Sequence, residues 1–278
     1  MAFNKTASMT AVETYIAQFS DKTIAVSVHD LESGSEIQIN ADHAFHPAST
    51  FKVHVMMEGF RQAQDEIFSL DDRLQIINSF TSIADGSKFS LDVNDDSETT
   101  LYSRLGENEN ILELIRLMIV RSSNLATNIL IEKVGTQNVN AFIRALGIEG
   151  VSVLRGVEDN VAFRLGMNNS ATARGLTHMM QLIAEGKVVS KLISGKMIEI
   201  MLKQEFNESI PALLPKSTKV AHKTGWTGVF YHDTGIVFPE NRKPYAISIM
   251  TRGFAENDEK AAHECMATVS KMIYEPGQ

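Results

Sequence analysis

The alternation of apolar and polar residues predicts a β-hairpin near each end of the chain. Apolar residues recur at every second position in 24–28 and 37–39, on either side of a polar turn at 32–35. This period of two is typical of strands. Residues 228–238 and 245–251 are also apolar-rich, and the short polar segment between them contains two prolines. A second hairpin is therefore expected there.

Apolar residues at helical spacing occupy much of the remaining chain. Segment 50–60 is apolar nearly all round, which is typical of a helix buried on every side. Residues 81–110 are polar and predict a long irregular insertion. The predicted helices are residues 11–19, 50–60, 110–120, 125–134, 170–185, 194–206 and 257–274.

These elements predict an α/β (α+β) fold in which both chain ends build one antiparallel sheet. The terminal helices flank this sheet, and an all-helical domain is inserted between its strands. We expect residues 1–45 and 207–278 to form the sheet domain and residues 46–206 the helical domain. A cleft between the two is the expected place for a functional site.

Composition excludes several classes of protein. The 278 residues are 44% hydrophobic and 22% charged, with a net charge of −8, which is typical of a globular chain and not of a disordered one. No basic block is present, so we expect no nucleic-acid partner. The single cysteine, Cys265, excludes an internal disulfide and a cysteine-cluster metal site. The eight histidines suggest no metal site, and we expect no cofactor.

No apolar run is long enough to predict a membrane span. The first residues lack the basic and apolar regions of a signal peptide. We therefore expect a cytoplasmic protein as the sequence stands, or a periplasmic or secreted one if an export signal has been removed. We also expect a monomer.

The first candidate motif is Ser49-Thr-Phe-Lys52, which follows Pro47 at the start of the buried helix. Ser49 would lie in the first helical turn, and Lys52 on the same face three residues later. Desolvation lowers the pKa of a lysine and lets its neutral amine accept a proton from serine. Taken alone, however, the motif is more typical of an ordinary helix start with a surface lysine.

Two more motifs follow along the chain. Ser122-Ser123-Asn124 lies between two apolar helices, where an ordinary helix N-cap is the alternative. His222-Lys-Thr-Gly-Trp226 begins a strand, where a basic turn is the alternative. Its Gly225 would let a substrate backbone approach the strand closely.

Taken together, S-x-x-K, S-x-N and K-T-G resemble the motif set of the class A serine β-lactamases and the penicillin-binding DD-peptidases. The class A fold is the closer of the two. The resemblance implies that Ser49 is the nucleophile, that Lys52 shares its proton and that Ser122 carries a proton to the leaving nitrogen. It also implies an oxyanion hole made by the backbone N–H groups of Ser49 and Trp226.

The same resemblance implies the substrate contacts. Asn124 would bind the carbonyl of the acyl side chain, whereas Lys223 and Thr224 would hold the substrate carboxylate beside Gly225. The usual cationic helper on the following strand falls near Asp233, where no arginine stands, and Arg252 is expected to replace it. Trp226 is bulky at a position where small residues are common, so it is expected to narrow the cleft.

Class A enzymes also use a glutamate that activates the deacylating water. Glu158 is the candidate, since it lies 158 − 122 = 36 residues after Ser122. Its usual asparagine partner, four residues later, is Ala162 here, and Asn160 is the nearest substitute. The alternative is a solvated acidic loop.

The resemblance implies a serine hydrolase that opens a β-lactam amide through a Ser49 acyl-enzyme. It would act in β-lactam catabolism and antibiotic resistance. Two alternatives remain at this point: a DD-peptidase or carboxylesterase on the same fold, and a non-catalytic penicillin-binding sensor module. The expected partner is accordingly a small molecule, which is a β-lactam, a peptide or an ester.

Overall fold

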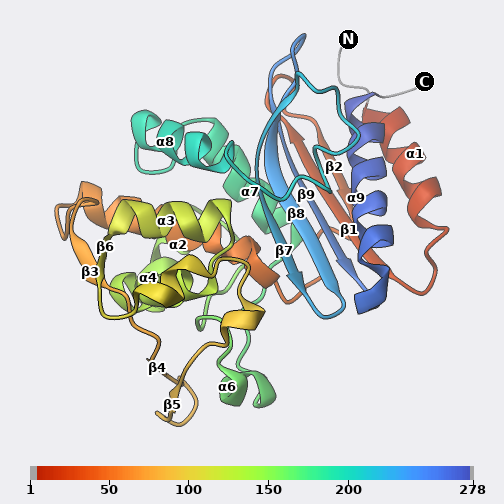
Figure 1. The fold of residues 1–278 in the computed structure, drawn as a ribbon. Helices are drawn as coiled ribbons and strands as arrows, with labels where there is room; N and C mark the ends of the chain where they lie inside the picture. Colours follow the sequence, from red (N-terminus) through yellow and green to blue (C-terminus); the bar gives the residue numbers. More distant parts are fainter. Residues whose placement is uncertain (1–4, 276–278) are drawn as a thin grey trace. The chain divides into compact units, whose positions relative to one another are not determined.

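The computed structural model describes residues 5–275. The chain forms two compact units (Figure 1). The first comprises the described residues up to Thr50, the short segment Ile148–Val151, and the chain from Ser170 onward. The second comprises Phe51–Gly147 and Ser152–Asn169.

A five-stranded antiparallel sheet forms the centre of the first unit, as the sequence predicts. Its order is β2-β1-β9-β8-β7, so the N-terminal hairpin pairs with the last strand of the chain. The edge strand β7 carries the K-T-G motif. The strands are β1 (Thr23–Asp30), β2 (Glu36–Ile39), β7 (Lys219–Thr227), β8 (Phe230–Phe238) and β9 (Tyr245–Arg252).

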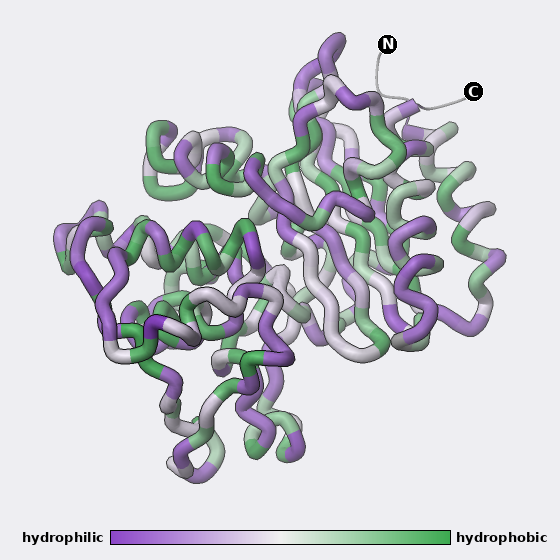
Figure 2. Tube along the Cα trace, viewed as in Figure 1, coloured by the Kyte–Doolittle hydropathy of each residue, from purple (hydrophilic) through white to green (hydrophobic). Residues whose placement is uncertain are grey.

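Helices α1 (Lys5–Ile16) and α9 (Glu259–Tyr274) pack on one face of this sheet. Hydrophobic and hydrophilic residues alternate along α9 (Figure 2), and its buried side includes Val269. Val269 belongs to the same core as Val26 and Ile249 of the sheet. Both chain ends therefore stabilise one hydrophobic core, which explains why the terminal helices form.

Helix α7 (Ala173–Ala184) packs against β1, β8 and β9, and α8 (Lys191–Met201) packs against α7 and β7. Thr177 donates a hydrogen bond of 3.1 Å to the Ser27 carbonyl in β1. These two helices therefore belong to the unit that contains the sheet. This division differs from the expected boundary at residue 206, because helical periodicity does not reveal which partner a helix buries its apolar face against.

The second unit is mainly helical. Helix α2 packs against α3, α4 and α5. Nearly all of its residues are buried, as the apolar character of segment 50–60 predicts. Helix α5 was not predicted from the sequence. The helices are α2 (Lys52–Gln64), α3 (Ile111–Val120), α4 (Asn124–Val134), α5 (Thr136–Ala145) and the short α6 (Asn160–Arg164).

The polar insertion contains short ordered elements. Two small sheets pair β3 (Arg73–Gln75) with β6 (Asn108–Asn110) and β4 (Phe80–Thr81) with β5 (Lys88–Phe89). Two 3₁₀ turns, η2 (Val93–Asp95) and η3 (Thr100–Arg104), lie between β5 and β6. Across the described residues, no helix is long and apolar enough to cross a membrane.

Two buried histidines predict a loss of stability in acid. His54 on α2 and His232 on β8 are each 1% exposed, and burial lowers the pKa of each to about 4. The unfolded chain binds these protons near pH 6.5. The two histidines therefore leave the free energy of unfolding undiminished above pH 6.5. They lower it as pH falls toward 4, because only the unfolded chain gains protons in that range. From pH 7 to pH 4, each histidine should remove about 3 kcal/mol from the free energy of unfolding.

Urea unfolding of wild type and His54→Leu at several pH values between 7.5 and 4.5 measures this effect. The variant should show a shallower pH dependence than wild type. His43→Gln, at an exposed histidine, is the matched control and should keep the wild-type slope. Equal slopes in wild type and His54→Leu would contradict the prediction.

Candidate active site

Ser49 lies in a tightly held turn of the first unit. The turn is the 3₁₀ segment η1 (Ala48–Phe51), which leads directly into α2. Ala48 adopts a φ of +46°, a strained conformation for a residue with a side chain. The His46 ring accepts a hydrogen bond from the Ala48 N–H at 3.2 Å, and the Pro47 carbonyl accepts the Thr50 hydroxyl at 2.7 Å. These bonds stabilise the strained backbone that presents Ser49.

Strand β7 approaches this turn closely at Gly225. A Cβ atom at that position would lie 2.8 Å from the Ser49 backbone nitrogen and 3.1 Å from that of Thr50. Such distances are too short for any side chain, so only glycine permits the approach. The first unit thus brings the Ser49 N–H beside the strand that carries the other predicted oxyanion donor, Trp226.

The residues around Gly225 divide between the two faces of β7, because successive side chains alternate. Lys223 shares the face of Gly225, is fully buried and donates a hydrogen bond to the Thr224 carbonyl at 2.7 Å. Trp226 lies on the other face, 56% exposed, with its ring centroid 6.3 Å from that of its cross-strand neighbour Tyr231. The indole is therefore directed away from the face of Lys223, and its effect on the width of the cleft stays a prediction.

The position of the usual cationic helper holds no cation. Asp233 is fully buried and accepts hydrogen bonds from the His222 ring at 2.9 Å and from the Ile210 N–H at 3.0 Å. Arg252 lies at the end of β9, two strands away from β7. Its guanidinium is 3.4 Å from the Thr23 hydroxyl of β1, so the structure does not bring it to the K-T-G motif.

Lys52 is the centre of a buried cluster in the second unit. Its Nζ donates hydrogen bonds to the Ser122 carbonyl at 2.6 Å and to Asn124 Oδ1 at 2.9 Å, and it lies 3.3 Å from the Ser122 hydroxyl. Burial lowers the pKa of Lys52 to about 7, although the charges of Asp96 and Glu158 raise it. Near neutral pH this amine can therefore both accept and donate a proton.

The S-x-N motif forms the turn between α3 and α4. Ser122 has a φ of +58°, a second strained residue. Ser123 is the N-cap of α4, since its hydroxyl accepts the Ala126 N–H at 3.1 Å. The Asn124 side chain connects two site residues: its oxygen accepts from Lys52, and its Nδ2 donates to Glu158 Oε1 at 3.0 Å.

Glu158 belongs to the same cluster. It is half-buried with a φ of +60°. Burial raises the pKa of its carboxyl group, whereas hydrogen bonds from the Asp92 N–H at 3.2 Å and from Asn124 lower it. Asn160 is exposed, and none of its described hydrogen bonds reaches Glu158. Asn124 and the Asp92 backbone thus hold the carboxylate, whereas the sequence suggested Asn160 only as the nearest substitute for the missing asparagine.

The structure therefore gathers the predicted residues into two groups, one in each unit. Ser49 and the K-T-G strand lie in the first, and Lys52, Ser122, Asn124 and Glu158 in the second. Only Thr50 and Phe51 lie between Ser49 and Lys52 in the chain. Sequence reasoning missed Asp92 and Asp96, whose only signal is the acidic character of residues 92–98.

Comparisons with known proteins agree with this architecture. A model of the beta-lactamase enzyme family matches residues 7–276. An imipenem-hydrolyzing beta-lactamase of Enterobacter cloacae is 27% identical over 87% of this chain and 79% of its own length. The extended-spectrum beta-lactamase PER-1 of Pseudomonas aeruginosa is 22% identical over 91% of this chain and 82% of its own.

Solved structures share the fold. That of TLA-3 extended-spectrum beta-lactamase superposes with a TM-score of 0.84 at 21% identity, covering 98% of both chains. That of PBP-A gives 0.81 at 24% identity, covering 97% of this chain and 95% of the other. Because the family model spans nearly the whole sequence, the chain belongs to the beta-lactamase enzyme family, and its fold is that of the class A serine β-lactamases.

Proposed function

We propose that the protein is a serine hydrolase that opens the amide bond of β-lactams through an acyl-enzyme on Ser49. The observation that carries the proposal is the buried Lys52 cluster. An amine with a pKa lowered to about 7 lies three residues after the serine and contacts both Ser122 and Asn124. The beta-lactamase names of the relatives support the substrate class.

In the acylation step, the neutral Lys52 amine accepts the Ser49 proton while the Ser49 oxygen attacks the β-lactam carbonyl. The N–H groups of Ser49 and Trp226 stabilise the resulting oxyanion. When the carbon–nitrogen bond breaks, the Ser122 hydroxyl gives its proton to the leaving nitrogen and takes one from Lys52, which it meets at 3.3 Å. Lys52 is neutral again at the end of the step.

In the deacylation step, the Glu158 carboxylate removes a proton from water, and the resulting hydroxide attacks the ester carbonyl of the acyl-enzyme. The proton then passes from Glu158 to the departing Ser49 oxygen, which restores the starting state. The hydrogen bonds from Asn124 and Asp92 support this role, since they favour the charged form of the carboxylate.

A time course of intact-mass spectrometry with benzylpenicillin tests the proposal. We expect an adduct on Ser49 that forms and then clears as the product is released. An adduct that never clears would favour the sensor alternative, and the absence of any adduct would contradict the acyl-enzyme.

A DD-peptidase or esterase is the second candidate, because Ala162 replaces the asparagine that usually accompanies the deacylating glutamate. Rates with nitrocefin, a p-nitrophenyl ester and a D-Ala-D-Ala peptide separate these functions. Faster turnover of the ester or the peptide than of nitrocefin would favour the second candidate.

The Lys52 pKa predicts how acylation depends on pH. Only the neutral amine accepts the Ser49 proton, so the second-order rate of acylation should rise through about pH 7 and level off above it. Below that pH it should fall by about tenfold per unit. Lys52→Met keeps the buried volume but has no base, and it should slow acylation by about 10²–10⁴-fold.

Rapid-quench mass spectrometry with benzylpenicillin from pH 5 to 9 measures this profile. A rate that stays level between pH 5 and 9 would contradict the assignment of Lys52 as the base. So would a Lys52→Met variant that acylates at the wild-type rate.

A further inference from the structure

The carboxylate of Asp96 binds the first turn of α4, where the S-x-N motif ends. Asp96 is 6% exposed, and its Oδ2 accepts the N–H groups of Asn124 and Leu125, both at 2.9 Å. Since Ser123 caps the third free donor of the same turn at 3.1 Å, two side chains share the capping of α4. One of them comes from a loop distant in sequence.

The loop around Asp96 also holds the side chains of two predicted site residues. We call residues 92–96 the acidic strap. The Asp92 N–H donates to Glu158 Oε2 at 3.2 Å, and the Asp95 carbonyl accepts from Asn124 Nδ2 at 3.3 Å. Asn124 is therefore fixed at its backbone by Asp96 and at its side chain by Asp95.

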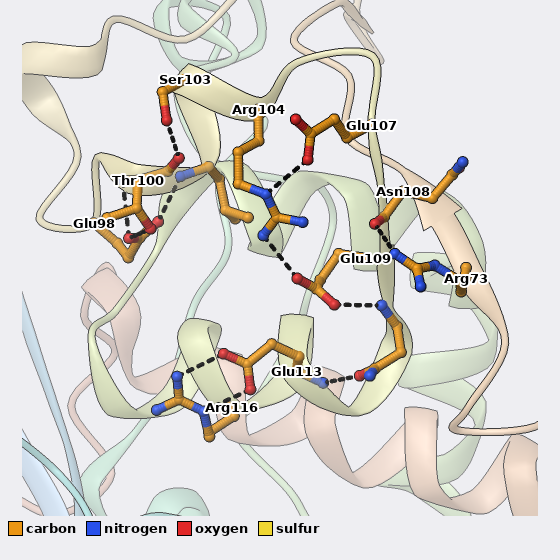
Figure 3. Close-up of polar contacts among 12 residues, drawn as sticks. Arg73, Glu98, Thr100, Ser103, Arg104, Glu107, Asn108, Glu109, Glu113 and Arg116 are labelled. Carbon is orange, nitrogen blue, oxygen red and sulfur yellow. Dashed lines mark hydrogen bonds and ion pairs between the residues drawn. The ribbon is translucent and has the colours of Figure 1, made fainter.

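The chain that follows the strap is itself anchored. The Tyr102 hydroxyl and the Glu98 N–H each donate to the Asp96 carboxylate at 3.0 Å. Glu98 in turn accepts hydrogen bonds from Thr100 at the start of η3, and Arg104 at the end of η3 contacts Glu107 and Glu109 (Figure 3). The strap thus rests on an ordered support, although its sequence predicts an irregular insertion.

Asp96 also contributes charge to the cluster. Together with Glu158 it raises the pKa of Lys52 against the opposing effect of burial. It acts on Glu158 as well, where its negative charge raises the pKa of the carboxyl group. One buried carboxylate therefore influences both groups that exchange protons in the proposed mechanism.

We propose that Asp96 is a positioning residue of the active site. It orients Asn124 by capping α4, and it holds a negative charge against Asn124, whose side-chain oxygen accepts the hydrogen bond from Lys52. This inference rests on the proposed function, in which Lys52 is the base and Asn124 a substrate contact.

Asp96→Asn removes the charge and keeps the size of the side chain. NMR titration of protein labelled with ¹³C at the lysine ε-carbon reads the Lys52 pKa without any substrate, and Lys52→Met assigns its signal. We expect the Lys52 pKa to fall by about one unit in Asp96→Asn. Acylation by benzylpenicillin at pH 8 should slow by about tenfold or more, because a neutral amide binds the Asn124 and Leu125 N–H groups less strongly than the carboxylate does. An unchanged Lys52 pKa would overturn the proposed charge effect.

Ser123→Ala is the matched control, since it removes the other cap of α4 without changing any charge. It should lower stability and leave the Lys52 pKa at the wild-type value. An equal fall of the pKa in both variants would show that loosening of α4 is the cause, and would overturn the charge effect.

Asp96→Glu keeps the charge but displaces both oxygens by one methylene group. It should retain the Lys52 pKa and still slow acylation, so acylation at the wild-type rate would overturn the positioning role. This variant also serves if Asp96→Asn does not fold. If wild type forms no adduct, the proposed function fails, whereas the NMR titration still decides whether Asp96 controls Lys52.

Discussion

Replacing Ser49 by alanine should abolish the covalent adduct with benzylpenicillin and reduce hydrolysis by about 10⁶-fold. This is the size of effect that loss of a nucleophilic serine has in serine hydrolases. The strain at Ala48 and the close approach of Gly225 concern the backbone of this turn, and alanine preserves that backbone. The fold should therefore persist, with far-UV circular dichroism and the melting temperature close to wild type.

Intact-mass spectrometry after incubation with excess benzylpenicillin measures the adduct. Ser90→Ala, at an exposed serine of the polar insertion, is the matched control and should be labelled like wild type. An undiminished adduct on Ser49→Ala would exclude Ser49 as the nucleophile and would direct attention to another serine.

Replacing Glu158 by glutamine should make the acyl-enzyme accumulate. Glutamine keeps the shape, and its one oxygen can still accept a hydrogen bond from Asn124 or from Asp92, but it cannot take a proton from water. Loss of a general base typically costs ~10²–10⁴ in rate, or about 3–5 kcal/mol in activation free energy. The adduct on Ser49 should therefore persist at times when the wild-type adduct has cleared.

Acylation and deacylation need separate measurements in this variant. Removing the Glu158 charge also removes one of the two charges that raise the Lys52 pKa, so the pH profile of acylation should move to lower pH. Glu149→Gln, at an exposed glutamate nine residues before Glu158 in the chain, should clear its adduct like wild type. If Glu158→Gln deacylates within about twofold of wild type, Glu158 is not the base, and the assignment shifts toward a DD-peptidase or esterase.

The strands and the principal helices follow from local sequence pattern. The period-two residues around Val26 form β1, and the apolar segment after Ser49 forms the buried helix α2. Such pattern reports which side of an element is buried, and that information lies within one short stretch of chain. It does not show which other helix or strand that buried side packs against. Helices α7 and α8 were therefore expected in the helical domain, whereas their apolar sides pack with the sheet.

The chemistry-bearing residues were also visible in the sequence, because Ser49, Lys52, Ser122 and Lys223 stand in short motifs whose order and spacing are informative. The sequence did not reveal the groups that hydrogen-bond these residues or shift their pKa values. Asp96 accepts a hydrogen bond from Asn124, which is 28 positions away in the sequence, and Asp92 donates one to Glu158, which is 66 positions away. Contacts at such separations depend on tertiary packing. The sequence by itself thus determined the principal elements and the candidate reacting groups, whereas only the tertiary structure decided which buried charges and backbone donors contact them.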